Sequence, residues 1–175
     1  MHQRVRLRPL IESDLDLADT SGSSERDAGE FQWFGFTTAH AARRRFAENG
    51  SIGPDGGTFA VTFDDEPVGT VDWFKAFWGR AETSWCWTLG IGIVTDMRGR
   101  GIGTQAQRLV ADYLFRHTRA ERVQAFTDAE NAAERRALEK AGFTQEGVIR
   151  RGQWRGGSWH DQVLYSLLRS EWRSP

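Results

Sequence analysis

The segment from residue 84 to residue 143 constrains the fold more than any other part of the chain. It opens with a β-rich run, SWCWTLGIGIV (84–94), which leads into the glycine-rich stretch TDMRGRGIGTQ (95–105). A helical pattern, the strand-like RVQAFTD (122–128) and the helical NAAERRALEKAGF (131–143) follow. Alternation of strands and helices is typical of a sheet with helices packed on its faces.

The helix after the glycines is predicted from its apolar periodicity. Its apolar residues recur at the spacing of one helical face, at Ala106, Leu109, Val110, Tyr113 and Leu114. The second helix is predicted from its ends. Asn131 is a good N-cap, Gly142 suits the left-handed position after the last turn, and Phe143 can pack back on the helix.

The rest of the chain adds mainly strands. Alternating arginine and apolar residues predict a half-buried strand over 4–8, ended by Pro9. Ser13 is a candidate cap for a short helix with Leu15, Leu17 and Ala18. We expect a mobile loop at 21–30, a helix at 39–49, a hairpin of 57–63 with 67–77, and a final strand pair of 143–154 with 158–168. The order predicts one α/β domain, residues 1–175, with a mixed sheet.

Composition excludes several classes of protein. The chain has 175 residues, with 23 basic and 24 acidic side chains and a net charge of −1, so it has no electrostatic footprint for nucleic acid. No run approaches the ~18 apolar residues of a membrane span, and the start lacks the apolar core of a signal peptide. The one cysteine, Cys86, permits no internal disulfide and is expected to be a small buried hydrophobe. We expect a cytoplasmic protein.

The glycine stretch has the features of an anion site. Gly99, Gly101 and Gly103 lie between a strand and a helix, where backbone N–H groups and the positive helix end converge. Arg98 and Arg100 add positive charge. The spacing fits neither a Walker A loop nor the dinucleotide fingerprint. Taken alone, a plain glycine-rich turn explains the stretch equally well.

Two longer motifs resemble the acetyl-CoA core of the GNAT superfamily of N-acetyltransferases. The family's pyrophosphate signature, Arg/Gln-x-x-Gly-x-Gly/Ala, is matched within IGIVTDMRGRGIGTQAQ by Arg98, Gly101 and Gly103. Its later helix is matched within ENAAERRALEKAGFTQEG by Asn131, Glu139, Lys140, Gly142 and Phe143. The C-terminal part resembles the branch that acetylates ribosomal-protein N-termini, with its antibiotic- and metabolite-modifying relatives. The resemblance implies a single GNAT domain whose largely antiparallel sheet splays at the acetyl-CoA site.

The resemblance also implies roles for residues that bind the acyl donor. Free backbone groups at Ile93 and Val94 would pair with the pantetheine amides. The pyrophosphate would be held by backbone N–H groups of Arg98, Gly99, Arg100, Gly101, Ile102, Gly103 and Thr104. Asn131 would contact the pantetheine arm. In this family the amine attacks the thioester directly in a ternary complex, so the enzyme supplies position, a proton path and oxyanion stabilisation.

The catalytic positions depart from the family pattern. Leu138 occupies the slot of the usual tyrosine, and Glu134 stands where the resembled branch often has serine. Glu134 is therefore a candidate acid or base, although Asn131 and Glu134 are also spaced as a capping box. Asp72 and Glu82 are alternatives that could bind the amine or take its proton, or simply be solvated.

The other titratable groups are weaker candidates for a catalytic or metal-binding role. His160 and Asp161 are adjacent in a strand and face opposite sides, so they form no ordinary dyad. Tyr165 fits a core position. The remaining histidines have no ligand spacing, so we predict no metal.

Aromatic residues point to the acceptor. FQWFGF, with Trp33 and Phe36, falls where relatives form the acceptor wall, and Trp85 and Trp87 share one strand face before the cofactor segment. We expect one of these two tryptophans to line the acceptor cleft, with burial in the core as the alternative. Such walls suit a ring-bearing or apolar amine. The loop acids Glu25, Asp27 and Glu30 leave a cationic acceptor open.

The sequence thus predicts transfer of acetyl from acetyl-CoA to the primary amine of a small molecule. Three alternatives remain at this point: acetylation of a protein N-terminal amine, acyl transfer from a carrier-protein thioester, and a catalytically silent CoA-binding domain. The expected partners are acyl-CoA and the amine, without nucleic acid or membrane, and a homodimer is left open.

Overall fold

A computed structural model describes residues 4–17 and 24–174 of the chain. Its strands and helices follow the chain in this order: β1 (Val5–Pro9), η1 (Glu12–Asp14), α2 (Glu25–Ala28), α3 (His40–Asn49), β2 (Ile52–Gly53), β3 (Gly56–Phe63), β4 (Glu66–Phe77), β5 (Trp85–Ile93), η2 (Thr95–Met97), α4 (Ile102–His117), β6 (Arg122–Asp128), α5 (Ala132–Ala141), β7 (Thr144–Arg155) and β8 (Ser158–Leu168).

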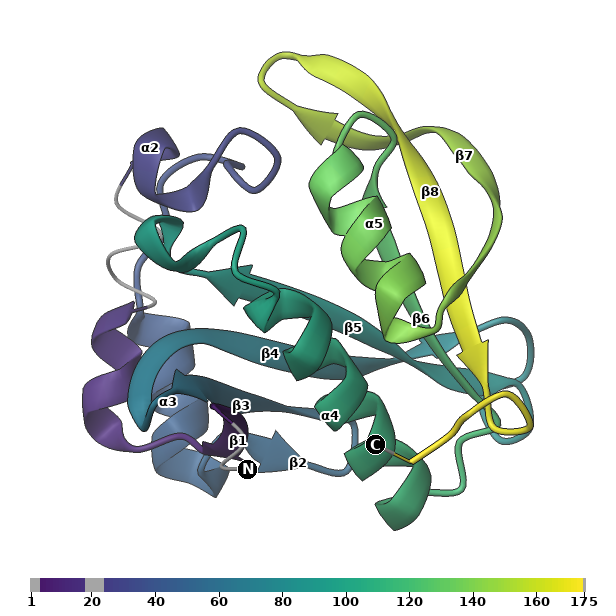
Figure 1. Ribbon diagram of the computed structural model, residues 1–175, viewed down its shortest axis with the longest axis horizontal. Coiled ribbons are helices and arrows are strands. Elements are labelled where there is room, and N and C mark those ends of the chain that lie inside the picture. Colours follow the sequence, from purple (N-terminus) through teal and green to yellow (C-terminus); the bar gives the residue numbers. More distant parts are fainter. Residues whose placement is uncertain (1–3, 18–23, 175) are drawn as a thin grey trace.

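The strands form one sheet in the order β1-β3-β4-β5-β6-β8-β7, with β2 paired to β3. Only the contact between β5 and β6 is parallel; the other pairings are antiparallel, which confirms the predicted mixed sheet. The parallel contact is short, running from Trp87 opposite Val123 to Leu89 opposite Ala125. Beyond it the two strands diverge, as Figure 1 shows, so the sheet opens into a V between β5 and β6.

Helices cover the two faces of the sheet unequally. α4 and α5 lie on one face and α3 on the other (Figure 1). Of the predicted apolar residues of α4, Ala106, Val110 and Leu114 are buried and Leu109 and Tyr113 are partly buried. The helix also buries Ile102, Ala111 and Phe115. Trp73 of β4 packs against Tyr113 of α4, with ring centroids 5.9 Å apart, so odd-numbered residues of β4 face this helix. The main core therefore lies between the sheet and α4.

The predicted ends of α5 are confirmed. The Asn131 side chain accepts a hydrogen bond from the Glu134 N–H at 3.1 Å, as an N-cap does. Gly142 has a φ of 101°, in the left-handed region that favours glycine. Phe143 N–H donates to the Leu138 carbonyl at 3.0 Å, and the phenyl ring is buried.

Trp87 is a core residue, so the alternative of burial in the core applies to it and it does not line an acceptor cleft. Only 4% of Trp87 is exposed, and its Nε1 donates to Thr118 Oγ1 at the end of α4, at 3.0 Å. Trp85 packs edge-on against it, with centroids 5.3 Å apart. Strand alternation directs both rings to the α4 face, where the helix covers them.

Two local predictions also need correction. Residues 25–28 of the predicted loop form α2, capped by Ser24 Oγ; a four-residue helix is too short to show periodicity. Residues 15–17 are helical, as predicted, but η1 precedes them, and the Ile11 N–H at its start donates to Asp14 at 2.8 Å, so Asp14 rather than Ser13 is the bonded side chain. Ala18 and residues 21–23 lie outside the described residues. The two-residue strand β2 was not predicted.

Trp87→Ala should destabilise the domain by roughly 3–5 kcal/mol, because it removes a buried ring and leaves a cavity under α4. Chemical denaturation would measure the change in unfolding free energy. Trp159→Ala is the matched control, since that ring is 56% exposed and should cost far less. A small loss of stability at Trp87 combined with a selective loss of amine binding would restore the acceptor-wall interpretation.

Candidate functional site

The glycine stretch lies at the N-terminus of α4. The structural reason for glycine differs between its three positions. Gly99 and Gly101 have φ angles of 74° and 77°, which side chains other than glycine rarely adopt. Gly103 is in the first turn of the helix, and a Cβ there would meet only Ile91 Cδ1, at 3.9 Å. The backbone demands glycine at the first two positions, whereas Gly103 keeps the surface open.

No side chain caps this end of α4. The first intrahelical bond runs from Gln105 N–H to the Gly101 carbonyl, at 3.1 Å, so the N–H groups of Ile102, Gly103 and Thr104 have no helical partner. Together with the positive end of the helix dipole, these donors can bind an anion. Arg100, in the same loop, is exposed to solvent.

The diverging end of β5 presents an edge without a partner strand beside this loop. Val94 N–H donates to the Val68 carbonyl in β4, at 2.9 Å. Because peptide groups alternate along a strand, those of Ile91 and Ile93 point the other way, into the gap toward β6. An extended ligand can add to such an edge as a further strand. The edge and the glycine loop together fit the elongated shape of an acyl-CoA.

The guanidinium of Arg98 does not point at the anion site, which corrects its expected contribution of charge there. Its Nε donates to the Ile93 carbonyl at 2.7 Å, and its Nη2 donates to the carbonyls of Ala28 at 3.0 Å and Asp27 at 3.3 Å. A Cβ on Gly29 would lie 2.6 Å from Arg98 Nη1. Arg98 therefore joins α2 to the end of β5.

Glu134 is a half-buried carboxylic acid between α4 and α5. Its carboxylate accepts a hydrogen bond from Gln107 Nε2 of α4, and burial raises its pKa to about 7. The capping box is only half formed, because Asn131 N–H donates to the Asp128 carbonyl at 3.0 Å instead of to Glu134. Capping thus accounts for Asn131 but not for the Glu134 carboxyl group. A group with this pKa can give or take a proton near neutral pH.

Asp72 lies on the opposite face of the sheet, at the point where the V begins. It pairs in register with Gly90, the first residue of β5 beyond its last partner in β6. A Cβ on Gly90 would lie 2.8 Å from both carboxylate oxygens, so glycine leaves the space that the carboxylate fills. Burial raises the pKa of Asp72, against the opposing charge of Arg45.

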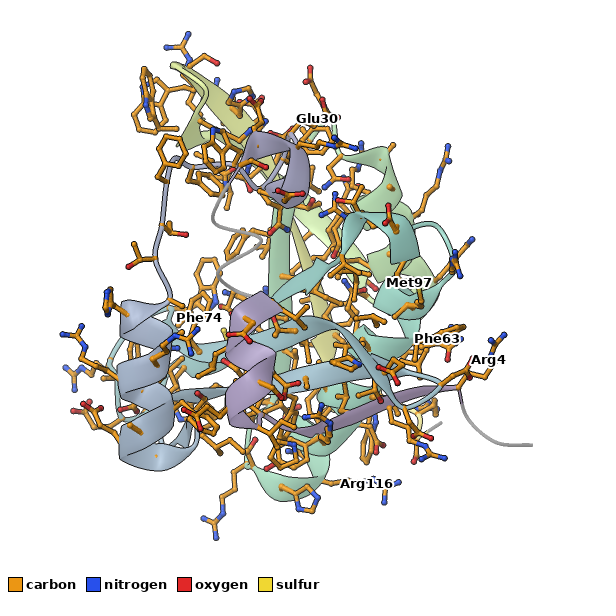
Figure 2. All side chains as sticks on the ribbon, turned by 90° about the vertical axis from the view of Figure 1, so that its left-hand side faces the viewer. Arg4, Glu30, Phe63, Phe74, Met97 and Arg116 are labelled. Atoms are coloured by element: carbon orange, nitrogen blue, oxygen red, sulfur yellow. The ribbon has the colours of Figure 1, made fainter. Side chains whose placement is uncertain are left out.

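A cavity of about 470 Å³ adjoins Asp72 on the α3 side of the sheet. Its lining mixes apolar and polar residues. The apolar ones include Leu10, Leu15, Ala42 and Phe74, and the polar ones include Asp14, Arg45, Ser51, Thr58 and Thr70. Figure 2 shows Phe74 on this side and Met97 on the other. Trp33 and Phe36, expected at the acceptor wall, form an edge-to-face pair 5.3 Å apart in the segment after α2, outside the lining of this cavity.

The other titratable groups have structural partners. His160 lies near the buried pair of Asp128 and Arg155, whereas Asp161 accepts the Arg151 N–H at 2.7 Å, so the two neighbours form no dyad, as predicted. Tyr165 and Cys86 are buried, as predicted. Glu82 is exposed in the turn between β4 and β5.

The described residues hold neither a metal-binding cluster nor a membrane-spanning helix. No cluster of histidine, cysteine and acidic side chains in 4–17 and 24–174 could hold a metal ion. Within the same ranges, no helix is both long and apolar enough to cross a membrane.

Sequence reasoning missed Gln107 and Gln32. Gln107 is 1% exposed and holds the Glu134 carboxylate. Its position three residues before Val110, on the apolar side of the helix, was the available signal. Gln32 Nε2 donates to the Ile91 carbonyl at 3.2 Å, a contact between distant segments that leaves no local pattern.

The chain is similar in sequence to known N-acetyltransferases. "Probable N-acetyltransferase YjcK" of Bacillus subtilis is 34% identical over 108 residues, which cover 62% of this chain and 58% of the relative. "Putative ribosomal N-acetyltransferase YdaF", also of Bacillus subtilis, is 37% identical over 84 residues, 48% of this chain and 46% of the relative. The chain spans about half the length of these curated relatives.

The fold also matches solved acetyltransferases. A spermidine N-acetyltransferase chimera of Vibrio cholerae SpeG and hSSAT gives a TM-score of 0.79 at 17% identity, over 97% of this chain and 98% of that one. This likeness concerns the fold alone. The Acetyltransferase (GNAT) domain family matches residues 4–144, most of the chain and all of the strand–loop–helix site described above. The chain belongs to the GNAT acetyltransferase family.

Proposed function

We propose that the protein transfers acetyl from acetyl-CoA to the primary amine of a small molecule. The observation that carries this proposal is Asp72, a carboxylate with no side-chain donor among the described residues, placed where the sheet opens and beside a cavity lined by both apolar and polar residues. A carboxylate there attracts an ammonium group, and the apolar part of the lining suits the body that bears it.

The acyl donor would lie along the V of the sheet. The three unpaired N–H groups at the start of α4 would bind the pyrophosphate, with Arg100 nearby. The edge of Ile91 and Ile93 would pair with the pantetheine amides, and Asn131 would contact the arm from α5. This path brings the thioester toward Gly90, next to Asp72.

The two carboxyl groups suit the two proton transfers of the reaction. Asp72 would take a proton from the ammonium group, and the free amine would then attack the thioester carbonyl. Collapse of the tetrahedral intermediate forms the amide and breaks the C–S bond. Glu134, on the other side of the V, would protonate the departing thiolate. Two acids whose surroundings raise their pKa values are the pattern expected of such a pair.

A protein N-terminal amine is the second candidate acceptor, since a relative carries a ribosomal name. A thiol-release assay decides between them. We expect turnover with small primary amines that carry apolar or ring-containing bodies, and little with peptides offering a free N-terminus. Turnover only with peptides would overturn the small-molecule proposal. CoA binding without turnover on either panel would indicate a silent domain, and turnover only with a carrier-protein thioester would indicate a different donor.

Asp72→Asn should raise the Michaelis constant of the amine at least about tenfold, because the ammonium group loses its counter-charge. CoA affinity should stay unchanged, since Asp72 lies on the face away from α4. Steady-state kinetics in both substrates would measure this split. Glu66→Gln, at the exposed start of the same strand, is the matched control. An equal loss for both substrates would contradict the acceptor role.

Glu134→Gln should lower the turnover rate about a hundredfold or more, because glutamine cannot give a proton to the thiolate. In the wild type, the rate contribution of Glu134 should fall as pH rises through about 7, where the acid ionises. The exposed neighbour Glu130 supplies the control variant Glu130→Gln. A normal rate in Glu134→Gln at every pH would remove Glu134 from the mechanism.

Glu134→Gln should also change how the stability of the protein depends on pH. Folding raises the pKa of Glu134 from 4.5 to about 7, so the folded state binds the proton more tightly than the unfolded state. The wild type should therefore lose stability relative to Glu134→Gln between about pH 5 and pH 8, as the buried acid is forced to ionise. Denaturation curves at several pH values measure this difference. Parallel pH dependence in the two proteins would contradict the buried position.

Gly103→Val should weaken CoA binding at least about tenfold while changing stability by less than about 1 kcal/mol. Gly103 is helical and almost uncrowded, so the fold accepts the side chain, but a branched group would cover the N–H donors. Calorimetric titration with CoA, beside thermal unfolding, checks both parts. Gly103→Ala is the smaller control and should keep most of the affinity. Normal CoA affinity in folded Gly103→Val would exclude this loop as the pyrophosphate site.

A further inference from the structure

Residues 24–36, comprising α2 and the chain that follows it, form a segment that spans the opening of the V; we call it the bridging segment. In Figure 1, α2 lies beyond the end of β5, and the following chain runs toward the hairpin of β7 and β8. Figure 2 shows Glu30 on this segment, at the far end of the molecule from Arg116. The segment therefore lies over the opening in which the acyl donor would bind.

The bridging segment is held on both sides of the opening. On the β5 side, Arg98 donates to the carbonyls of Asp27 and Ala28, which close α2. On the β6 side, the ring of Phe31 lies 5.4 Å from the guanidinium carbon of Arg155. Arg155 is itself paired with Asp128, at the end of β6, at 2.7 Å. Arg98 also bonds the last residue of β5, and Arg155 pairs with the last residue of β6, so each anchor is tied to a strand end at the opening.

A third contact reaches into the opening itself. Gln32 Nε2 donates to the Ile91 carbonyl at 3.2 Å. This carbonyl points into the gap toward β6, on the edge where an extended ligand would add as a strand. The Gln32 amide thus fills the place that an N–H group of such a ligand would take. Gln32 is exposed to solvent, so little packing opposes its departure.

We propose that Gln32 is a positioning residue that competes with the acyl donor for the Ile91 carbonyl. The inference depends on the proposed donor site in the V. Binding of the donor displaces the Gln32 amide and frees the second half of the bridging segment, which carries Trp33 and Phe36, while Arg98 keeps α2 in place. Occupation of the donor site is thereby communicated to this segment through one hydrogen bond.

Affinity for CoA tests the competition directly. Gln32→Ala removes the competitor without touching the donor site, so it should bind CoA about threefold to tenfold more tightly than the wild type, the range expected for one net hydrogen bond. Gln145→Ala, an exposed glutamine on β7, is the matched control and should leave CoA affinity unchanged. Titration calorimetry with CoA measures all three. A variant that merely damaged the structure would bind CoA less tightly, not more.

Hydrogen exchange tests the communication. In the wild type, CoA should increase amide exchange in residues 31–36, because the Gln32 contact is lost. In Gln32→Ala the same residues should exchange faster from the start and show no further increase with CoA. Equal or weaker CoA affinity in Gln32→Ala, or wild-type exchange that CoA does not change, would overturn the inference. Failure of both proteins to bind CoA would instead overturn the proposed donor site.

Discussion

The loss of pairing between β5 and β6 is the feature on which the rest of the site depends. Hydrogen bonds join these strands only from Trp87 to Leu89, and beyond that point neither strand has the other as partner. Unpaired strand edges are costly when buried, so the opening must be filled by ligand, water or side chains. Gln32 and Arg98 satisfy the two carbonyls of β5 that face the opening.

The same opening separates the two proposed proton-transfer groups. Asp72 lies over Gly90 on the α3 face, whereas Glu134 lies between α4 and α5 on the other. Each is withdrawn from water, which raises both pKa values, and neither has a cation bonded to it that would hold it ionised. A thioester placed between them would have an acid near the sulfur and a base near the amine.

Local patterns in the sequence were sufficient for most elements and for the donor side of the site. The period of α4, the capped ends of α5 and the glycines at 99 and 101 each reflect short-range requirements of helix geometry or backbone conformation. Glu134 was identified as a candidate from its motif position. The raised pKa of Glu134 could not be predicted from the sequence, because the burial that causes it comes from the packing of α5 on α4.

The sequence by itself determined the order of the longer strands and helices, the glycine loop before α4 and the family, because these rest on residues close together in the chain; the short elements α2 and β2 were not predicted. Tertiary structure alone decided which face each strand residue occupies and what each charged group bonds. Strand alternation gave Trp85 and Trp87 a shared face, but only the position of α4 made that face the core. Likewise, the position of Arg98 in the glycine stretch suggests that it binds an anion. In the folded protein its guanidinium instead donates to carbonyls of α2, which is distant in the chain.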